Sequence, residues 1–293
     1  MGRVGPPQGE ALVTWVLAAL VCVAVVVTYA RLEPGELYHV SGSGLGGGLS
    51  RALVVLNFPI ALVAIGLALV ALAVLPRRAW LVGAPAIALC AVVAWPGVVD
   101  QDDLDARPVN AVPALGVLLA LGLTLTAGRA RGSSFAPRRS LDGVRVALAV
   151  VVLLVSIPWL AAEVGVFLPE GVFIMERPGV DPDGTVIAAV HLGHHHGLDG
   201  SLILAGALLL SRAELRGRPA TAVRLYLSLA VGYGMVNLAQ DAWNEQLVKR
   251  DLVDWRIPSA LEPRPEPVWL AILGLAALVA LALRRETTVD SAP

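Results

Sequence analysis

Eight apolar runs, each close to the length of a bilayer-crossing helix, constrain the fold of this 293-residue chain more than any other feature. They cover residues 11–29, 52–75, 79–99, 111–127, 144–160, 186–210, 222–244 and 268–283. About 20 consecutive apolar residues cross the hydrocarbon core as a helix, and backbone groups in lipid must be hydrogen-bonded within their own segment. No run shows the alternation of a half-buried strand. The sequence therefore predicts an all-α polytopic membrane protein with eight transmembrane helices.

The composition agrees with a multi-pass protein of the cell membrane and excludes other classes. Hydrophobic residues make up 57% of the chain and charged residues 15%, with a mean hydropathy of +0.74, well beyond the balance of a soluble domain. A net charge of −1 predicts no nucleic-acid partner. Cys22 and Cys90 both fall inside apolar runs, so we expect neither a disulfide framework nor a paired-cysteine metal site. The first run is longer than the core of a signal peptide and is expected to remain as an anchor.

The charged loops between the runs predict how the chain is oriented. Arginines occupy every second loop, within residues 77–78, 129–139, 212–218 and 284–285, while the intervening segments 100–105 and 170–183 are acidic. Basic loops face the cytoplasm in membrane proteins. Both termini are therefore expected to be cytoplasmic.

Similar segments in the two halves predict an internal duplication. The segment 48–56 (GLSRALVVL) resembles 197–205 (GLDGSLILA), and Trp95 followed by Asp103–Leu104 corresponds to Trp243 followed by Asp251–Leu252. An even number of helices in each half makes such repeats parallel. We expect two four-helix halves, residues 1–132 and 133–293, with chance similarity among Gly-, Ala-, Leu- and Val-rich helices as the alternative.

A histidine-rich segment in the second half is the strongest candidate for a site. Residues 190–201 (VHLGHHHGLDGS) hold four of the five histidines of the chain. On a helix with 3.6 residues per turn, His191, His195 and Asp199 fall within roughly 80° of one face. Ala189, Gly193, Gly197 and Gly200 lie on the opposite face, where small residues allow a neighbouring helix to approach closely. The candidate metal ligands are His191, His194, His195, His196 and Asp199.

Polar side chains also follow one face of the run 222–244, within roughly 140°. We expect Asp241 and Glu245, together with Glu163 at the outer end of the run 144–160, to act as catalytic carboxylates. The second layer of the site, which would orient the ligands, is expected to contain Tyr233, Asn237, Gln240 and Asn244. An interhelical hydrogen-bond seam is the alternative for this polar face. Imidazoles and carboxylates without thiolates suit a divalent metal such as zinc, iron or manganese.

These features favour a membrane metalloenzyme that acts on a lipid or on a small molecule delivered through the membrane. A divalent-metal or proton-coupled transporter is the alternative, but a conduction path needs polar groups through the whole bilayer. The inner halves of the runs consist almost entirely of Ala, Val, Leu and Gly. A non-catalytic metal- or pH-sensing subunit is the third reading. The metal and its nuclearity, the reaction, and homo- or hetero-oligomeric assembly stay open.

Overall fold

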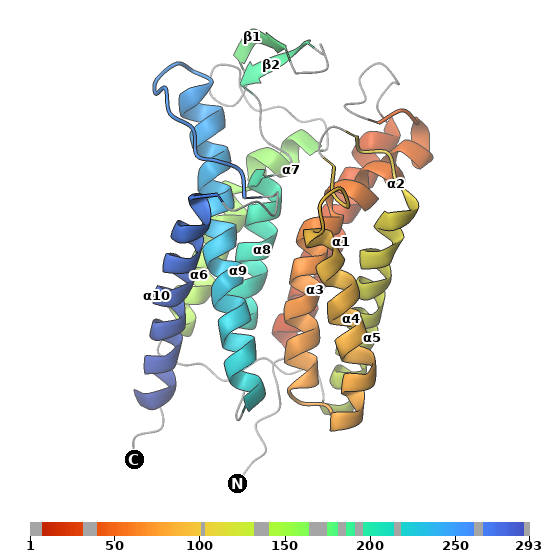
Figure 1. Cartoon of the computed structure of the whole chain (residues 1–293), viewed down its shortest axis with the longest axis vertical. Coiled ribbons are helices and arrows are strands. Elements are labelled where there is room, and N and C mark those ends of the chain that lie inside the picture. The colour runs from red at the N-terminus through yellow and green to blue at the C-terminus, as the bar shows by residue number, and fades with distance from the viewer. Residues whose placement is uncertain are drawn as a thin grey trace.

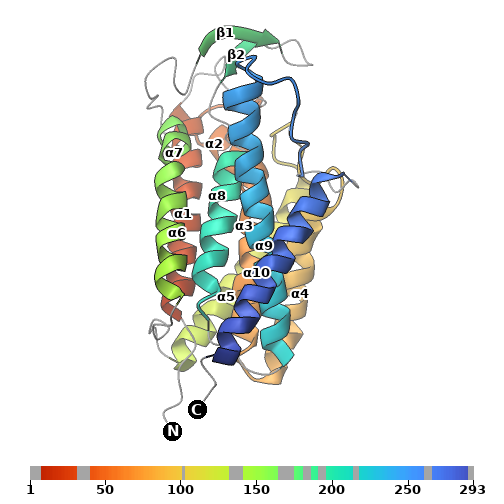
Figure 2. The ribbon, with the colours of Figure 1, turned by 90° about the vertical axis from the view of Figure 1, so that its left-hand side faces the viewer.

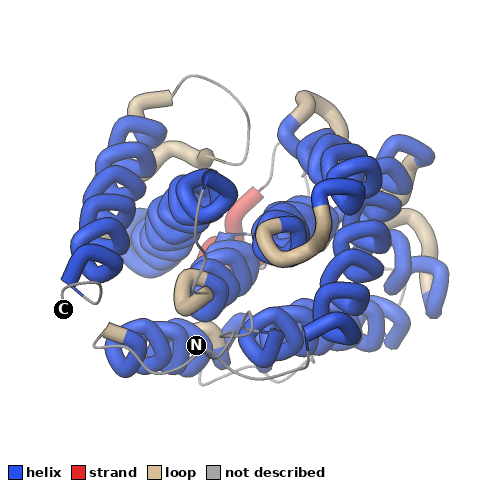
Figure 3. Tube along the Cα trace, turned by 90° about the horizontal axis from the view of Figure 1, so that it is seen from below, coloured by secondary structure: helices blue, strands red, loops and turns tan. Residues whose placement is uncertain are grey.

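The structure is a computed structural model that describes residues 8–31, 40–100, 103–131, 141–163, 175–180, 186–190, 196–213, 218–260 and 266–289. Its long helices lie side by side in a bundle (Figure 1, Figure 3). Each of the eight apolar runs contains at least one helix, so the prediction of a predominantly helical protein is confirmed.

The helices alternate in direction along the bundle (Figure 1). In chain order the elements are α1 (Gln8–Arg31), α2 (Gly44–Val55), α3 (Asn57–Leu72), η2 (Arg77–Ala79), α4 (Trp80–Ala91), η3 (Val92–Ala94), η4 (Pro108–Asn110), α5 (Ala111–Arg131), α6 (Asp142–Val155), α7 (Ile157–Glu163), β1 (Met175–Val180), β2 (Val186–Val190), α8 (His196–Leu210), α9 (Arg218–Trp243), η5 (Asn244–Val248) and α10 (Val268–Val289). We call the end of the bundle at which α1 begins and α10 ends the terminal end. The opposite end, at which α8 begins below β1 and β2, is the hairpin end (Figure 1, Figure 2).

Several of these helices are long and apolar enough to cross a membrane. Among the described residues there are four, at 9–31, 77–94, 108–130 and 220–248, and a fifth if the bent pair α2–α3 counts as one span. The apolar helices at 197–210 and 268–284 are shorter than 18 residues. The molecule therefore has the makeup of a helical membrane protein.

A bend of 56° separates α2 from α3 at Leu56. Pro59 follows in the first turn of α3, where its missing N–H and its ring interrupt the hydrogen-bond ladder of a continuous helix. The Asn57 side chain donates a hydrogen bond of 3.0 Å to the carbonyl of Asn110. A proline also follows the break between α6 and α7, where Pro158 comes directly after Ser156 and Ile157.

The run 186–210 is not one helix, and this part of the prediction was wrong. Residues Val186–Val190 form β2, which pairs antiparallel with β1, and α8 begins only at His196. The segment 186–190 is rich in β-branched residues, which favour strands, and the intervening sequence DPDG at 181–184 has the composition of a tight turn. A short apolar run cannot be assigned to strand or helix by periodicity alone.

Helix α8 lies at the centre of the bundle. Every residue from 197 to 208 is buried, and α8 contacts α1, α3, α6 and α9. Its contact with α9 depends on two glycines. A Cβ atom on Gly234 would lie 2.9 Å from the carbonyl oxygen of Gly200, and one on Gly200 would lie 2.8 Å from the backbone nitrogen of Leu238. The close approach expected of the small residues in this segment is therefore observed at Gly200.

Candidate functional site

Two buried carboxylates lie at the hairpin end of α8 and α9. Asp199, in the first turn of α8, is 2% exposed, and Asp241, in the last turn of α9, is 3% exposed. Charged groups inside a membrane bundle are costly, and they usually mark functional positions. These two carboxylates are the part of the expected cluster that the structure places in the protein interior.

The packing of α8 against α9 adds further polar side chains to this region. Asn237, which is 1% exposed, lies against Gly200: its Cβ atom is 3.2 Å from the position that a Cβ on Gly200 would occupy. Ser201 Oγ and Gln240 Oε1 are buried and have no hydrogen-bond partner among the described residues. Buried polar atoms of this kind are rare in native proteins and require an explanation.

The histidines fall largely outside the part of the chain that the structure describes. His191, His194 and His195 lie in the undescribed segment 191–195, and only the backbone of His196, the first residue of α8, is described. Glu163 is the last residue of α7, and its side chain is likewise outside the description. Within the described ranges, no group of three or more His, Cys, Asp or Glu side chains is arranged to hold a metal ion.

Most of the expected second-layer residues bind a loop. Gln240 Nε2 donates to the carbonyl of Ile257 at 3.4 Å, and Asn244 forms two hydrogen bonds with the backbone of Ile257, at 3.1 and 3.2 Å. The Tyr233 hydroxyl donates to the carbonyl of Ala260 at 3.4 Å. These side chains hold the segment 251–260 against α9.

Glu245, an expected catalytic carboxylate, lies in η5, a π-helical turn that ends α9. Its carboxylate forms an ion pair of 2.8 Å with Lys249. Asp241 is buried in the last turn of α9, whereas Glu245 is half-buried, so Asp241 is the better placed of these two expected catalytic carboxylates for chemistry inside the bundle. Single π-helical turns occur frequently at functional sites.

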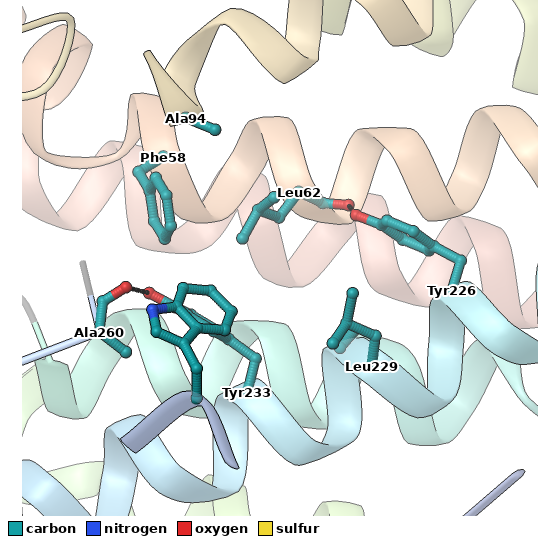
Figure 4. Close-up of a pocket in the computed structure, with 9 residues that line it drawn as sticks. Phe58, Leu62, Ala94, Tyr226, Leu229, Tyr233 and Ala260 are labelled. Atoms are coloured by element: carbon teal, nitrogen blue, oxygen red, sulfur yellow. Dashed lines mark hydrogen bonds between the residues drawn. The ribbon is translucent and has the colours of Figure 1, made fainter. Parts of the chain in front are cut away.

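An apolar cavity of about 140 Å³ adjoins this region (Figure 4). Phe58 and Leu62 from α3 lie on one side of the cavity, and Tyr226, Leu229 and Tyr233 from α9 lie on the other (Figure 4). The remaining lining residues are Ala94, Ala230, Ala260 and Trp269. An apolar cavity of about 150 Å³ stays free of water and accommodates benzene, so this one has room for a ring or a short hydrocarbon segment.

Aromatic side chains define the shape of the cavity. The ring centroid of Tyr233 lies 5.8 Å from that of Phe58 and 5.9 Å from that of Trp269, within the range of favourable aromatic pairs. The Tyr226 hydroxyl donates a hydrogen bond of 2.5 Å to the carbonyl of Leu62, which fixes its ring at the cavity wall (Figure 4).

Tyr233 connects the cavity to the buried carboxylates. Tyr233 lines the cavity, and the next residue, Gly234, packs against Gly200, the residue after Asp199. The polar region and the apolar cavity are therefore neighbours. Sequence reasoning identified Tyr233 and Asp199, but it missed the cavity because Phe58, Tyr226 and Trp269 come from distant segments that no motif links.

A second set of buried polar side chains, which the sequence analysis did not predict, lies at the terminal end. We call it the ion cluster: Arg212 Nη1 lies 2.9 Å from Glu10 Oε1, Arg212 Nε lies 3.4 Å from Asp142 Oδ2, and Arg145 Nη1 lies 2.8 Å from Asp142 Oδ1. All four side chains are largely buried. The sequence analysis did not predict this cluster, because Glu10, Asp142 and Arg212 lie just outside the apolar runs. Acidic residues at the starts of α1 and α6 and an arginine after the end of α8 complement the helix dipoles, and this was the available signal.

Comparison with known proteins found no family model, no curated protein and no solved structure that matches this chain. The apolar helices and the buried polar groups define its class, a helical membrane protein, and any assignment of function rests on the site itself.

Proposed function

We propose that this chain is a membrane metalloenzyme whose site opens at the hairpin end and faces away from the cytoplasm. The observation that carries the proposal is the position of Asp199. It is a buried carboxylate in the first turn of α8, directly after the histidine-rich segment, and the next residue, Gly200, packs against α9 beside Tyr233 of the aromatic cavity. Pockets that combine an apolar wall with a few convergent polar groups are typical of ligand and substrate sites.

The proposed topology has eight membrane crossings and two parallel four-helix halves, residues 1–132 and 133–293. The alternating helix directions and the shared end of α1 and α10 support it (Figure 1). Arg77 and Arg78 are exposed between α3 and α4 at the terminal end, and Asp103 is exposed between α4 and α5 at the hairpin end. By the positive-inside rule, the terminal end is the cytoplasmic one.

The proposed ligands of the metal are His191, His194, His195 and His196 with Asp199. Asp241 serves as the base, with Glu163 and Glu245 as the other carboxylates available to the site. A zinc, iron or manganese ion held there would polarise a carbonyl or phosphoryl group or activate water. The cavity beside Tyr233 would bind the apolar part of a lipid or of another membrane-delivered substrate.

A divalent-metal or proton-coupled transporter is the second candidate, and the ion cluster is the observation in its favour. It provides buried charge at the terminal end of α8, opposite Asp199. Against it, residues 202–210 of α8, between the two polar groups, are entirely apolar. A transport path would need polar groups or exposed backbone in this layer.

Elemental analysis of the detergent-purified protein, prepared without chelators, tests the metal site directly. We expect a stoichiometric divalent metal in the wild type and its loss in His195→Ala. The matched control is His39→Ala, which removes the one histidine outside the cluster and should leave the metal content unchanged. Full metal occupancy in His195→Ala, or a wild type without metal, would refute the proposal.

Incubation with a total lipid extract distinguishes an enzyme from a transporter. An enzyme converts a lipid or a co-extracted small molecule to a new product, detected by mass spectrometry, and Asp241→Asn abolishes this conversion while the metal remains bound. Uptake of the same metal into sealed proteoliposomes without any lipid conversion would instead establish the transporter.

A further inference from the structure

The cavity between α3 and α9 has the size of one small ring. Its volume is about 140 Å³, close to that of a cavity of about 150 Å³ that stays dry and takes up benzene. An extended acyl chain covers about half of the roughly 30 Å hydrocarbon core of a bilayer, so most of such a chain would remain outside. The volume therefore favours a compact ligand over an acyl chain.

Aromatic side chains from three helices form the walls of this cavity. Phe58 comes from α3, Tyr226 and Tyr233 come from α9, and Trp269 comes from the first turn of α10. The ring of Tyr233 is tilted by 52° from that of Phe58 and by 37° from that of Trp269, so these rings do not stack flat on one another. A further aromatic ring can join them in offset or edge-to-face contact, which is favourable beyond the area that it buries. An alkane of the same volume would not gain these contacts.

The two hydroxyl groups in the lining already have hydrogen-bond partners. Tyr226 donates to the carbonyl of Leu62, and Tyr233 donates to the carbonyl of Ala260 (Figure 4). No charged side chain is among the described residues that line the cavity, so an ammonium group would lose its hydration there without gaining an ion pair. The part of a ligand that enters the cavity is therefore uncharged and apolar.

Asp199 lies near the hairpin side of this cavity. Helices α3 and α8 both run toward the terminal end (Figure 1), and a Cβ on Gly206 would lie 3.5 Å from the side chain of Val63. Asp199 precedes Gly206 by seven residues, or about two turns, and therefore lies on the face of α8 that packs against α3. Phe58 precedes Val63 by five residues. Asp199 and the cavity residue Phe58 are thus at the same height in the bundle to within about one helical turn.

We propose that the cavity binds one benzene-sized aromatic ring, and that a polar substituent of this ring extends toward Asp199. The inference rests on the proposed function and narrows its substrate to a lipid-soluble, single-ring aromatic compound with an oxygen-bearing substituent, in place of an acyl lipid. The aromatic walls hold the ring, and the substituent is the part of the molecule that reaches the polar region at the start of α8.

Photolabelling of the detergent-purified chain with phenyl(trifluoromethyl)diazirine tests the proposal, with mass spectrometry to locate the labelled residues. We expect saturable labelling, of at most one probe per chain, in the peptides that contain Phe58 and Tyr233. Fluorobenzene should displace the probe at least tenfold more effectively than n-hexane at the same concentration in the micelles, and Trp269→Leu should reduce this preference several-fold. Equal displacement by the two compounds, or unsaturable labelling spread over the outer faces of the helices, would overturn the proposal.

Filling the cavity provides the decisive variants. Leu229→Trp and Ala94→Phe add bulk from two different sides, and each should lower the saturable labelling at least tenfold, so that a folding defect in one variant leaves the other as the test. Leu225→Trp is the matched control, since Leu225 lies one turn earlier on α9, is exposed and does not line the cavity. It should be labelled like the wild type. Unchanged labelling in a folded cavity variant would refute the proposal.

Metal content and ring binding are separate measurements on the same preparation. The described residues that line the cavity include none of the proposed metal ligands, so His195→Ala should lose the metal and still bind the ring. A wild type that holds its metal without saturable labelling would refute the ring site alone. A wild type without metal that is labelled saturably would refute the metalloenzyme and support the ring site.

Discussion

Arg212→Gln tests the ion cluster at the terminal end and the way in which it fixes α8. The guanidinium of Arg212 contacts Glu10 at 2.9 Å and Asp142 at 3.4 Å, and the side chains are 11%, 1% and 3% exposed. The four members of the cluster that the structure describes are two carboxylates and two guanidinium groups, whose formal charges sum to zero. Removing one guanidinium leaves an excess negative charge in a buried position.

The expected loss of unfolding free energy is about 3–5 kcal/mol, the range for breaking one partner of a buried ion pair. The ion pair of 2.8 Å between Asp142 and Arg145 remains after the substitution. The loss of unfolding free energy should therefore come mainly from the Glu10 carboxylate, which loses its ion pair with Arg212. The double variant Glu10→Gln/Arg212→Gln restores charge balance and should be at least as stable as Arg212→Gln alone. A coupling energy of about 0.5–3 kcal/mol between the two positions is expected for groups in direct contact.

Equilibrium unfolding in mixed detergent micelles measures these free energies for the wild type, both single variants and the double variant. Arg78→Gln, an exposed arginine at the same end of the bundle, is the control and should change stability by less than about 0.5 kcal/mol. Additive losses from the two single substitutions would show that Glu10 and Arg212 do not interact. The reasoning about the buried cluster would then be wrong.

Three further predictions concern packing, the loop and topology. Gly234→Ala should destabilise the protein in the same unfolding assay, because the added Cβ would lie 2.9 Å from the carbonyl oxygen of Gly200. Gly274→Ala is the control: its added Cβ would meet nothing beyond its own helix within 4 Å in the described part of the chain, so it should be neutral or stabilising. Asn244→Ala removes both hydrogen bonds to Ile257 and should cost about 1–3 kcal/mol while accelerating hydrogen exchange at Ile257; unchanged exchange would contradict the role assigned to Asn244. The topology is tested with single cysteines in a Cys22→Ala/Cys90→Ala background. Asp103→Cys should react with an impermeant thiol reagent added to sealed cells, whereas Arg78→Cys should react only after the cells are permeabilised. The reverse pattern would invert the proposed orientation.

The sequence predicts the helical elements well because the signal for each is local. Apolar runs near 20 residues indicate membrane helices directly, and the prolines at positions 59 and 158 follow the two breaks that divide a run into two helices. The small residue Gly200 also lies on the face of α8 that contacts α9, as its spacing predicts. Each of these features depends on residues within a few turns of one another.

Prediction from the sequence fails where contacts join distant segments of the chain. It also fails where a strand and a helix have the same apolar sequence pattern. The strand at 186–190 and the helix after it read as a single apolar run. The ion cluster joins the starts of α1 and α6 to the end of α8, and its members are ordinary charged residues at run boundaries in the sequence. Four of the polar residues expected on one face of α9 are buried: Tyr233, Asn237, Gln240 and Asp241. Asn244 and Glu245 are only half-buried, in η5. Periodicity could not reveal that Gln240 and Asn244 bind the backbone of Ile257.

Helix α8 has buried charged groups near both of its ends. Asp199 lies in its first turn, Arg212 follows its last residue, and its contact with α9 at Gly200 is too close to allow a larger side chain. Sliding α8 along the bundle would break the ion cluster at one end and the close packing of Gly200 against α9 at the other. A mechanism that moves this helix by a full turn would therefore have to break buried ion pairs in every cycle. A fixed α8 that presents its first turn to a substrate needs no such step, and for this reason the enzyme is the preferred proposal and the transporter the second.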